Sequence, residues 1–137
     1  MGGDETRFYR TELLIGPDAL KKLEGAHVAV FGMGGVGSYA VEGLARAGVG
    51  HLTLVDFDTI GRTNLNRQIM ALESTIGRPK VDAMGDRVLD INPACVVERH
   101  QVFFDRNRSP VSCSARIRSS SMRSTRSTRR SPSWSRP

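Results

Sequence analysis

Hydrophobic residues recur at two different spacings along the first hundred residues, and the alternation predicts strands and helices in turn. Residues 26–31 form a short apolar run that ends in glycines, which is typical of a strand buried on both faces of a parallel sheet. From Val36 to Ala47 apolar residues return every three or four positions, which predicts a helix that stops at Gly48. Residues 51–55 again have strand character. A strand, a helix and a strand joined by short turns predict a right-handed parallel crossover.

The same alternation extends to both sides of this unit. In residues 11–23 the apolar positions are interrupted by Gly16 and Pro17, which predicts two short helices with a break between them. Another helix is expected in residues 79–91, and residues 95–104 are the next strand candidate. The expected fold class is therefore α/β, with a Rossmann-like, doubly wound and mostly parallel sheet.

The distribution of charge changes this picture only in the C-terminal part. The net charge of +6 alone would suggest a nucleic-acid-binding protein. All 14 acids lie at or before Asp105 together with 11 of the 20 bases, so residues 1–105 carry 11 − 14 = −3. Residues 106–137 contain nine arginines, 11 serines and no acid. We expect this segment to be a disordered basic tail, and an RNA-binding arginine–serine tail is the alternative.

Cysteine content and hydropathy indicate a cytoplasmic protein. The two cysteines, Cys95 and Cys113, are too few for a four-thiolate zinc site and do not resemble a secreted disulfide framework. Cys95 is expected to be a small buried residue and not a nucleophile. Because no run of eighteen apolar residues occurs, no membrane association is expected.

A glycine-rich turn after the first strand introduces candidate chemistry. Four glycines are candidate phosphate-binding residues: Gly32, Gly34, Gly35 and Gly37. In the dinucleotide-binding pattern Gly32 permits a tight turn, and Gly34 lets the backbone approach the phosphate closely. Gly37 lets the helix pack closely on the strand. Asp56 ends the second strand 19 residues after Gly37, where such folds place an acid on a ribose hydroxyl. These features predict a nucleotide site, for ATP or for a nicotinamide or flavin cofactor.

A polar cluster downstream favours ATP over a redox cofactor. Asn64, Arg67 and Gln68 follow Asp56 closely, and Lys80 opens the next helix. Cleavage of a triphosphate gathers negative charge that fixed cations stabilise, whereas a redox site has little use for this set. Arg67 and Lys80 would supply that positive charge.

Taken together, five stretches resemble the ubiquitin-activating-like adenylating family, which includes the activators of the thiamine and molybdopterin sulfur carriers. The stretches are Arg7-Phe-Tyr-Arg10, Val30-Phe-Gly-Met-Gly-Gly-Val-Gly37, Leu54-Val-Asp-Phe-Asp58, Asn64-Leu-Asn-Arg-Gln68 and Gly77-Arg-Pro-Lys80. The resemblance covers residues 7–104. The stretches 10–16, 63–69 with 71–72, and 90–93 look most like the branch that dehydrates threonylcarbamoyladenosine in tRNA. The sulfur-carrier activators usually have Gln at the position of Asn66.

The resemblance implies roles for the matched residues. Three side chains are implied to be catalytic: Arg10, Arg67 and Lys80. Besides the four glycines, six side chains are implied to bind the nucleotide: Asp56, Asp58, Asn64, Arg67, Gln68 and Lys80. Arg10 would be an arginine finger in the site of a second copy, so a homodimer is the implied active form. For Arg7 a structural role is the alternative.

The implied reaction is attack of a carboxylate on the α-phosphorus of ATP, with Mg²⁺ neutralising the departing pyrophosphate. No metal ligands are assigned. In the dehydratase branch the carboxylate belongs to threonylcarbamoyladenosine of tRNA, which then cyclises with loss of AMP. The alternatives are an activator of a ubiquitin-like sulfur-carrier protein, with sulfur-relay proteins as partners, an oxidoreductase, and an inactive truncated fragment.

The expected organisation has three parts. Residues 1–25 form a helical lead-in, residues 26–105 form the N-terminal part of a nucleotide-binding adenylation domain, and residues 106–137 form the basic tail. Because the resemblance stops where the composition changes, we expect the tail to be the product of a shifted reading frame and the sheet to be incomplete.

Overall fold

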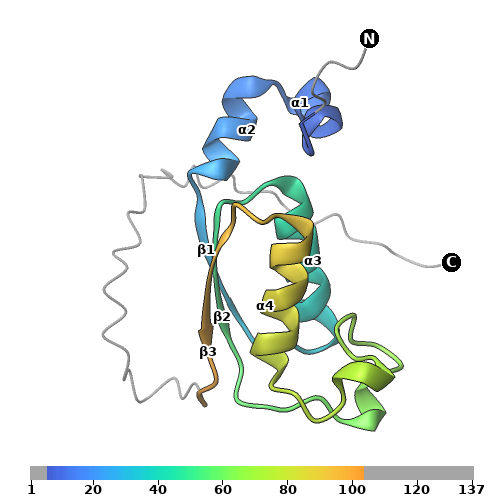
Figure 1. The fold of residues 1–137 in the computed structure, drawn as a ribbon. Coiled ribbons are helices and arrows are strands. Elements are labelled where there is room, and N and C mark those ends of the chain that lie inside the picture. Colours follow the sequence, from blue (N-terminus) through green and yellow to red (C-terminus); the bar gives the residue numbers. More distant parts are fainter. Residues whose placement is uncertain (1–5, 104–137) are drawn as a thin grey trace, which may run out of the picture.

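The computed structural model describes residues 6–103, and Figure 1 shows helices packed beside a small parallel sheet. The elements in chain order are α1 (Tyr9–Ile15), α2 (Pro17–Glu24), β1 (His27–Phe31), α3 (Gly35–Ala47), β2 (His51–Val55), the 3₁₀ turns η1 (Arg62–Asn64) and η2 (Glu73–Thr75), α4 (Lys80–Ile91) and β3 (Val96–His100). The strands lie in the order β1-β2-β3, and both pairings are parallel. The Rossmann-like α/β class is thus confirmed. The expected basic tail and Cys113 lie outside the described residues.

Glycine and proline set the predicted boundaries of the helices. Gly16 has a φ of +84° and separates α1 from α2, which begins with Pro17 at its first position. Gly48 ends α3 in the left-handed conformation, with a φ of +94°. Pro79 directly precedes α4, and Asn92 ends it. These four breaks agree with the sequence because each follows from the local backbone conformation of one residue.

Both crossover helices, α3 and α4, pack on the same face of the sheet (Figure 1). Parallel crossovers are almost always right-handed, and two of them that advance in the same direction across the sheet place both helices on one side. The centre of the core between these helices and the sheet is fully buried: Val41, Leu52, Leu54, Met84 and Val88.

The expectation that the first strand is buried on both faces is wrong for the described residues. Along β1 the side chains alternate between exposed and half-buried, and Phe31 is exposed at its end. β1 lies at the edge of the three-stranded sheet, and no helix within residues 6–103 covers the face opposite α3 and α4. The side chains of this open face are His27, Ala29, Phe31, His51, Thr53, Val55, Val96, Glu98 and His100.

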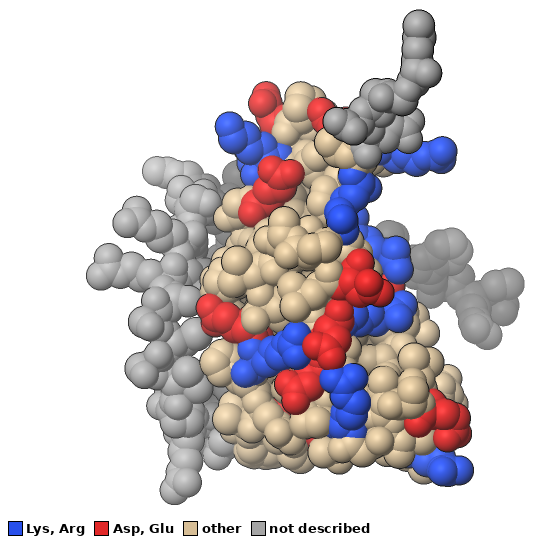
Figure 2. Space-filling view, in the orientation of Figure 1, with Lys and Arg blue, Asp and Glu red and all other residues tan. Residues whose placement is uncertain are grey.

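A buried carboxylate joins α3 to α4. Glu42 accepts hydrogen bonds from Arg87 at 2.5 and 3.0 Å and from Arg46 at 2.8 Å. Partial burial opposes ionisation, but the hydrogen bonds from Arg87 and Arg46 together hold the pKa of Glu42 below its ordinary value. Figure 2 shows acidic and basic side chains side by side over the helices.

We expect Glu42→Gln to lower the free energy of unfolding by about 1–3 kcal/mol at pH 7, because Arg87 loses its charged partner. Since the folded-state pKa is lowered, the contribution of Glu42 is present above the ordinary value of 4.5 and is lost as the pH falls below it. Urea unfolding at pH 7 and at lower pH measures both effects. Arg46→Gln is the control, since its mostly exposed side chain should contribute less than about 1 kcal/mol. If the free energy of unfolding of Glu42→Gln falls with pH as steeply as that of the wild type, Glu42 does not stabilise the fold through its charge.

Candidate functional site

The glycine turn between β1 and α3 requires glycine at two positions. Gly32 has a φ of +87°, which residues with a side chain rarely adopt, and its N–H donates to the carbonyl of Val55 at 2.8 Å. A Cβ atom at Gly37 would lie 1.8 Å from the carbonyl oxygen of Gly32. The chain therefore folds back on itself at the end of β1, with the start of α3 against the turn.

The two glycines between these positions leave the start of α3 accessible. A Cβ atom at Gly34 would meet nothing within 4 Å, and one at Gly35 would lie 3.5 Å from Cγ of Arg67. The N–H groups in the first turn of a helix lack partners within the helix, and the dipole makes this end positive. An anion at this end would thus have backbone donors in reach and the guanidinium-bearing Arg67 beside it.

Asp56 links the end of β2 to the glycine turn. Its side chain is buried, Oδ2 accepts the N–H of Met33 at 2.5 Å, and Oδ1 accepts the N–H of Asp58 at 2.8 Å. Both oxygens retain a lone pair for a further donor. The structure thus fixes the carboxylate at the carboxyl end of the sheet, and its ribose contact stays a prediction.

Lys80 lies at the start of α4 with its side chain only 7% exposed, and its Nζ is 3.0 Å from Oδ2 of Asp58. The carboxylate of Asp58 is itself 47% exposed, so the pair lies at the margin of the interior. A series of contacts thus joins the ammonium of Lys80 through Asp58 and Asp56 to Met33 in the glycine turn. The sequence placed these residues in one site, and their contacts agree with that placement.

The segment after β2 presents Arg67 and supports it locally. Nη1 of Arg67 donates to the carbonyl of Thr63 and to Oδ1 of Asn66, both at 2.9 Å. Oδ1 of Asn64 accepts the N–H of Gly61 at 2.9 Å and so stabilises the η1 turn. This contact gives Asn64 a capping role, and its contact with the nucleotide stays a prediction.

Gln68 is buried, and its Oε1 has no hydrogen-bond partner among the described residues. A buried acceptor without a donor costs about 1–3 kcal/mol, so such an atom favours a ligand that brings a donor. This observation agrees with a binding role for Gln68.

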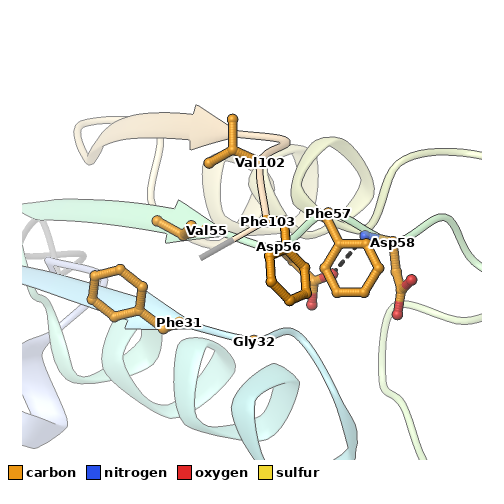
Figure 3. Close-up of a pocket in the computed structure, with 8 residues that line it drawn as sticks. All are labelled: Phe31, Gly32, Val55, Asp56, Phe57, Asp58, Val102 and Phe103. Carbon is orange, nitrogen blue, oxygen red and sulfur yellow. Dashed lines mark hydrogen bonds between the residues drawn. The ribbon is translucent and has the colours of Figure 1, made fainter. Parts of the chain in front are cut away.

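An aromatic pocket beside Asp56 was missed by sequence reasoning (Figure 3). The pocket of about 240 Å³ is lined by Phe31, Gly32, Val55, Asp56, Phe57, Asp58, Val102 and Phe103. The rings of Phe57 and Phe103 meet edge to face with centroids 5.1 Å apart. Flat apolar walls next to a fixed carboxylate suit a planar ring attached to a sugar. The available signal was Phe57, an exposed aromatic residue between two aspartates.

The two arginines of the N-terminal motif have different environments. Arg10 is exposed on α1, and Figure 1 places α1 at the end of the sheet opposite the glycine turn. The structure therefore does not bring Arg10 into the site of its own chain. Arg7 donates from Nη1 to the carbonyl of Ile91 at the end of α4. That contact supports the structural alternative for Arg7.

Cys95 is buried directly before β3. Burial raises the pKa of its thiol, which disfavours the thiolate that a nucleophile requires. This agrees with its interpretation as a small buried residue.

A parallel sheet with a glycine turn at the carboxyl end of β1, a buried acid after β2 and crossover helices on the sheet defines the class of Rossmann-like α/β domains. Within that class, residues 8–118 match the model of the ThiF family, and the chain belongs to this family. The match reaches beyond residue 104, where the resemblance in the sequence was expected to end. The adenylating family inferred from the motifs is thereby confirmed.

Relatives of two kinds are found. The chain is 53% identical over 98 residues to the tRNA threonylcarbamoyladenosine dehydratase of Bacillus subtilis, covering 72% of this chain and 39% of that protein. It is 45% identical over 89 residues to the molybdopterin-synthase adenylyltransferase of Salmonella typhimurium, covering 64% of this chain and 36% of that protein. The chain thus spans well under half the length of these relatives.

Solved structures agree with the same family. The Escherichia coli tRNA threonylcarbamoyladenosine dehydratase in complex with ATP superposes with a TM-score of 0.71 at 45% identity, covering 74% of this chain and 42% of that chain. The same enzyme has also been solved with AMP. Within residues 6–103 of the present chain, no helix is both long and apolar enough to cross a membrane.

Proposed function

We propose that this chain binds ATP at the glycine turn and belongs to an enzyme that adenylates a carboxylate, namely that of threonylcarbamoyladenosine in tRNA. The observation that carries the proposal is the series of contacts from Lys80 through Asp58 and Asp56 to the glycine turn. The contacts hold a buried cation near a loop that suits phosphates. A dinucleotide oxidoreductase does not need that cation.

In the proposed reaction the residues of this chain position ATP and stabilise charge. The N–H groups at the start of α3 bind phosphate oxygens, and Asp56 accepts a ribose hydroxyl while it holds the turn. Arg67 and Lys80 stabilise the negative charge that gathers on the departing pyrophosphate. Because the attacking carboxylate is already ionised, no general base is required. Asn64 and Gln68 orient phosphate or ribose oxygens.

Mg²⁺ is the remaining cofactor expected from the family resemblance, and the described residues form no site of their own for it near the turn. Asp56 and Asp58 are the carboxylates among the lining residues of the pocket, and both already have hydrogen-bond or ionic partners. These two carboxylates alone do not supply a complete set of ligands for the metal.

The substrate and the assembly follow from the relatives and from Arg10. The higher identity to the dehydratase than to the molybdopterin-synthase adenylyltransferase favours the tRNA substrate. Arg10 is exposed at the opposite end of the sheet, where it is available to a second copy, so we propose a homodimer. A cytoplasmic location is proposed on the cysteine content of the sequence.

The test is pyrophosphate release by the purified chain with ATP and either tRNA that bears threonylcarbamoyladenosine or a ubiquitin-like sulfur-carrier protein. We expect release with the modified tRNA. ATP binding is measured separately by equilibrium dialysis, because the chain spans only 39% of the Bacillus subtilis relative. A folded chain that does not bind ATP contradicts the proposal. Release only with the carrier protein supports the second candidate, which the 45% identity to the molybdopterin-synthase adenylyltransferase favours.

A further inference from the structure

All three histidines of the chain lie on the open face of the sheet, opposite α3 and α4. His27 and His51 occupy paired positions as the first residues of β1 and β2, and Glu98 lies on β3 beside Thr53. In a parallel sheet, paired residues project from the same face at neighbouring positions. Three separate strands therefore bring two imidazoles and one carboxylate together.

The side chains of this cluster face one another at short range. The rings of His27 and His51 are stacked, with centroids 3.6 Å apart and planes 6° from parallel. Nε2 of His51 is 3.0 Å from Oε1 of Glu98, and Nε2 of His27 is 2.7 Å from the hydroxyl of Thr53. One potential ligand atom from each of His27, His51 and Glu98 lies within 4.8 Å of the others.

We propose that His27, His51 and Glu98 form a binding site for Zn²⁺. Two imidazoles and a carboxylate are a donor set that zinc uses with three protein ligands and a water in the fourth position. Neighbouring ligands of a tetrahedral zinc ion are about 3.4 Å apart, given bonds of about 2.1 Å. The stacked rings direct their Nε2 lone pairs nearly parallel, so binding requires both imidazoles to turn about their side-chain bonds until the lone pairs meet at the ion. The partly exposed positions on the open face leave room for this movement.

The surroundings of the three ligands suit a metal. The Thr53 hydroxyl lies between them, since it also donates to Oε2 of Glu98 at 3.2 Å, and such contacts orient ligands around an ion. Glu98 brings a carboxylate to the cluster, because a glutamate side chain is ordinarily ionised at neutral pH. On binding, each ligating Nε2 gives up its hydrogen-bond contact and donates its lone pair to the ion.

This zinc site is separate from the glycine turn. His27 and His51 are at the amino ends of their strands, whereas Gly32 and Asp56 follow the carboxyl ends of the same strands. Zinc binding therefore does not depend on the proposed adenylation. The ion would connect all three strands on the face that lacks a described helix, so we expect it to raise thermal stability.

The experiment titrates the purified full chain with ZnCl₂ against a chromogenic chelator. We expect one ion per chain at micromolar zinc and at least a tenfold loss of affinity in His27→Gln, His51→Gln and Glu98→Gln. His100→Gln is the matched control, because the third histidine approaches Glu98 only to 3.7 Å and is outside the three-ligand cluster. Zinc should raise the Tm of the wild type and of His100→Gln, and not of the other three.

X-ray absorption at the zinc edge of the wild-type chain supplies a result that does not depend on the folding of variants. Nitrogen and oxygen neighbours at about 2.0–2.1 Å, including two imidazoles, support the site, whereas sulfur at about 2.3 Å would assign the ion to the cysteines. The proposal is overturned by that sulfur signal, by affinity unchanged in His27→Gln and His51→Gln, or by no stoichiometric binding below about 100 µM zinc.

Discussion

Replacing Gly37 with alanine is expected to remove about 3 kcal/mol or more from the free energy of unfolding, and with it the nucleotide site. The added Cβ atom would lie 1.8 Å from the carbonyl oxygen of Gly32, and both partners are backbone atoms that no side-chain rotation can separate. To relieve the contact, the start of α3 must move away from the end of β1. For a domain of this size such a loss lowers the Tm by about 12–24 °C.

Two other glycines provide the controls. Gly43→Ala adds the same methyl group to an exposed position of α3, where a Cβ meets nothing within 4 Å, and should raise stability by up to about 1 kcal/mol. Gly34→Ala also has room and should fold, but its methyl group enters the space proposed for phosphate and should weaken ATP binding. Thermal unfolding and ATP dialysis on all three variants separate packing from binding. A Gly37→Ala chain as stable as the wild type would refute the close-approach explanation.

Features set by one residue or by one helix were predictable from the sequence. The breaks at Gly16 and Gly48 depend on the conformation of single glycines, and the apolar spacing of 36–47 predicted that α3 is a helix. That spacing did not predict the buried side of α3, because Val36 is exposed while Ser38 and Glu42 are buried. The glycine turn and Asp56 were predictable because the fold fixes their distance along the chain. Each of these signals is contained within one crossover.

Features that depend on which strands are neighbours were not predictable in the same way. The alternating burial of β1 follows from its position at the sheet edge and from both helices covering one face, neither of which the run 26–31 encodes. The cluster of His27, His51 and Glu98 requires the register of three strands. Likewise Arg99 packs against Gly85, where a Cβ would lie 2.3 Å from Nε of Arg99, and this contact joins β3 to α4.

Replacing Lys80 with methionine is expected to lower the rate of pyrophosphate release by about 10²–10³-fold while the chain remains folded. Methionine fills a similar volume at this buried position, and Asp58 remains 47% exposed to water without its partner, so the free energy of unfolding should change by about 1 kcal/mol or less. The charge is valuable to catalysis because a cation in a poorly hydrated environment stabilises pyrophosphate more strongly than a solvated one. Pyrophosphate release and ATP dialysis measure the loss.

Two companion variants distinguish a phosphate-binding lysine from a structural ion pair. Arg78→Met removes a cation two residues away that pairs with Asp86 on the surface, and should leave ATP binding within about threefold of the wild type, since surface pairs contribute little. Asp58→Asn breaks the same ion pair as Lys80→Met but keeps the ammonium. If the pair is only structural, both changes to it should have the same effect. If Lys80 serves the phosphates, Lys80→Met should lose far more affinity and rate than Asp58→Asn, because only that change removes the positive charge from the site.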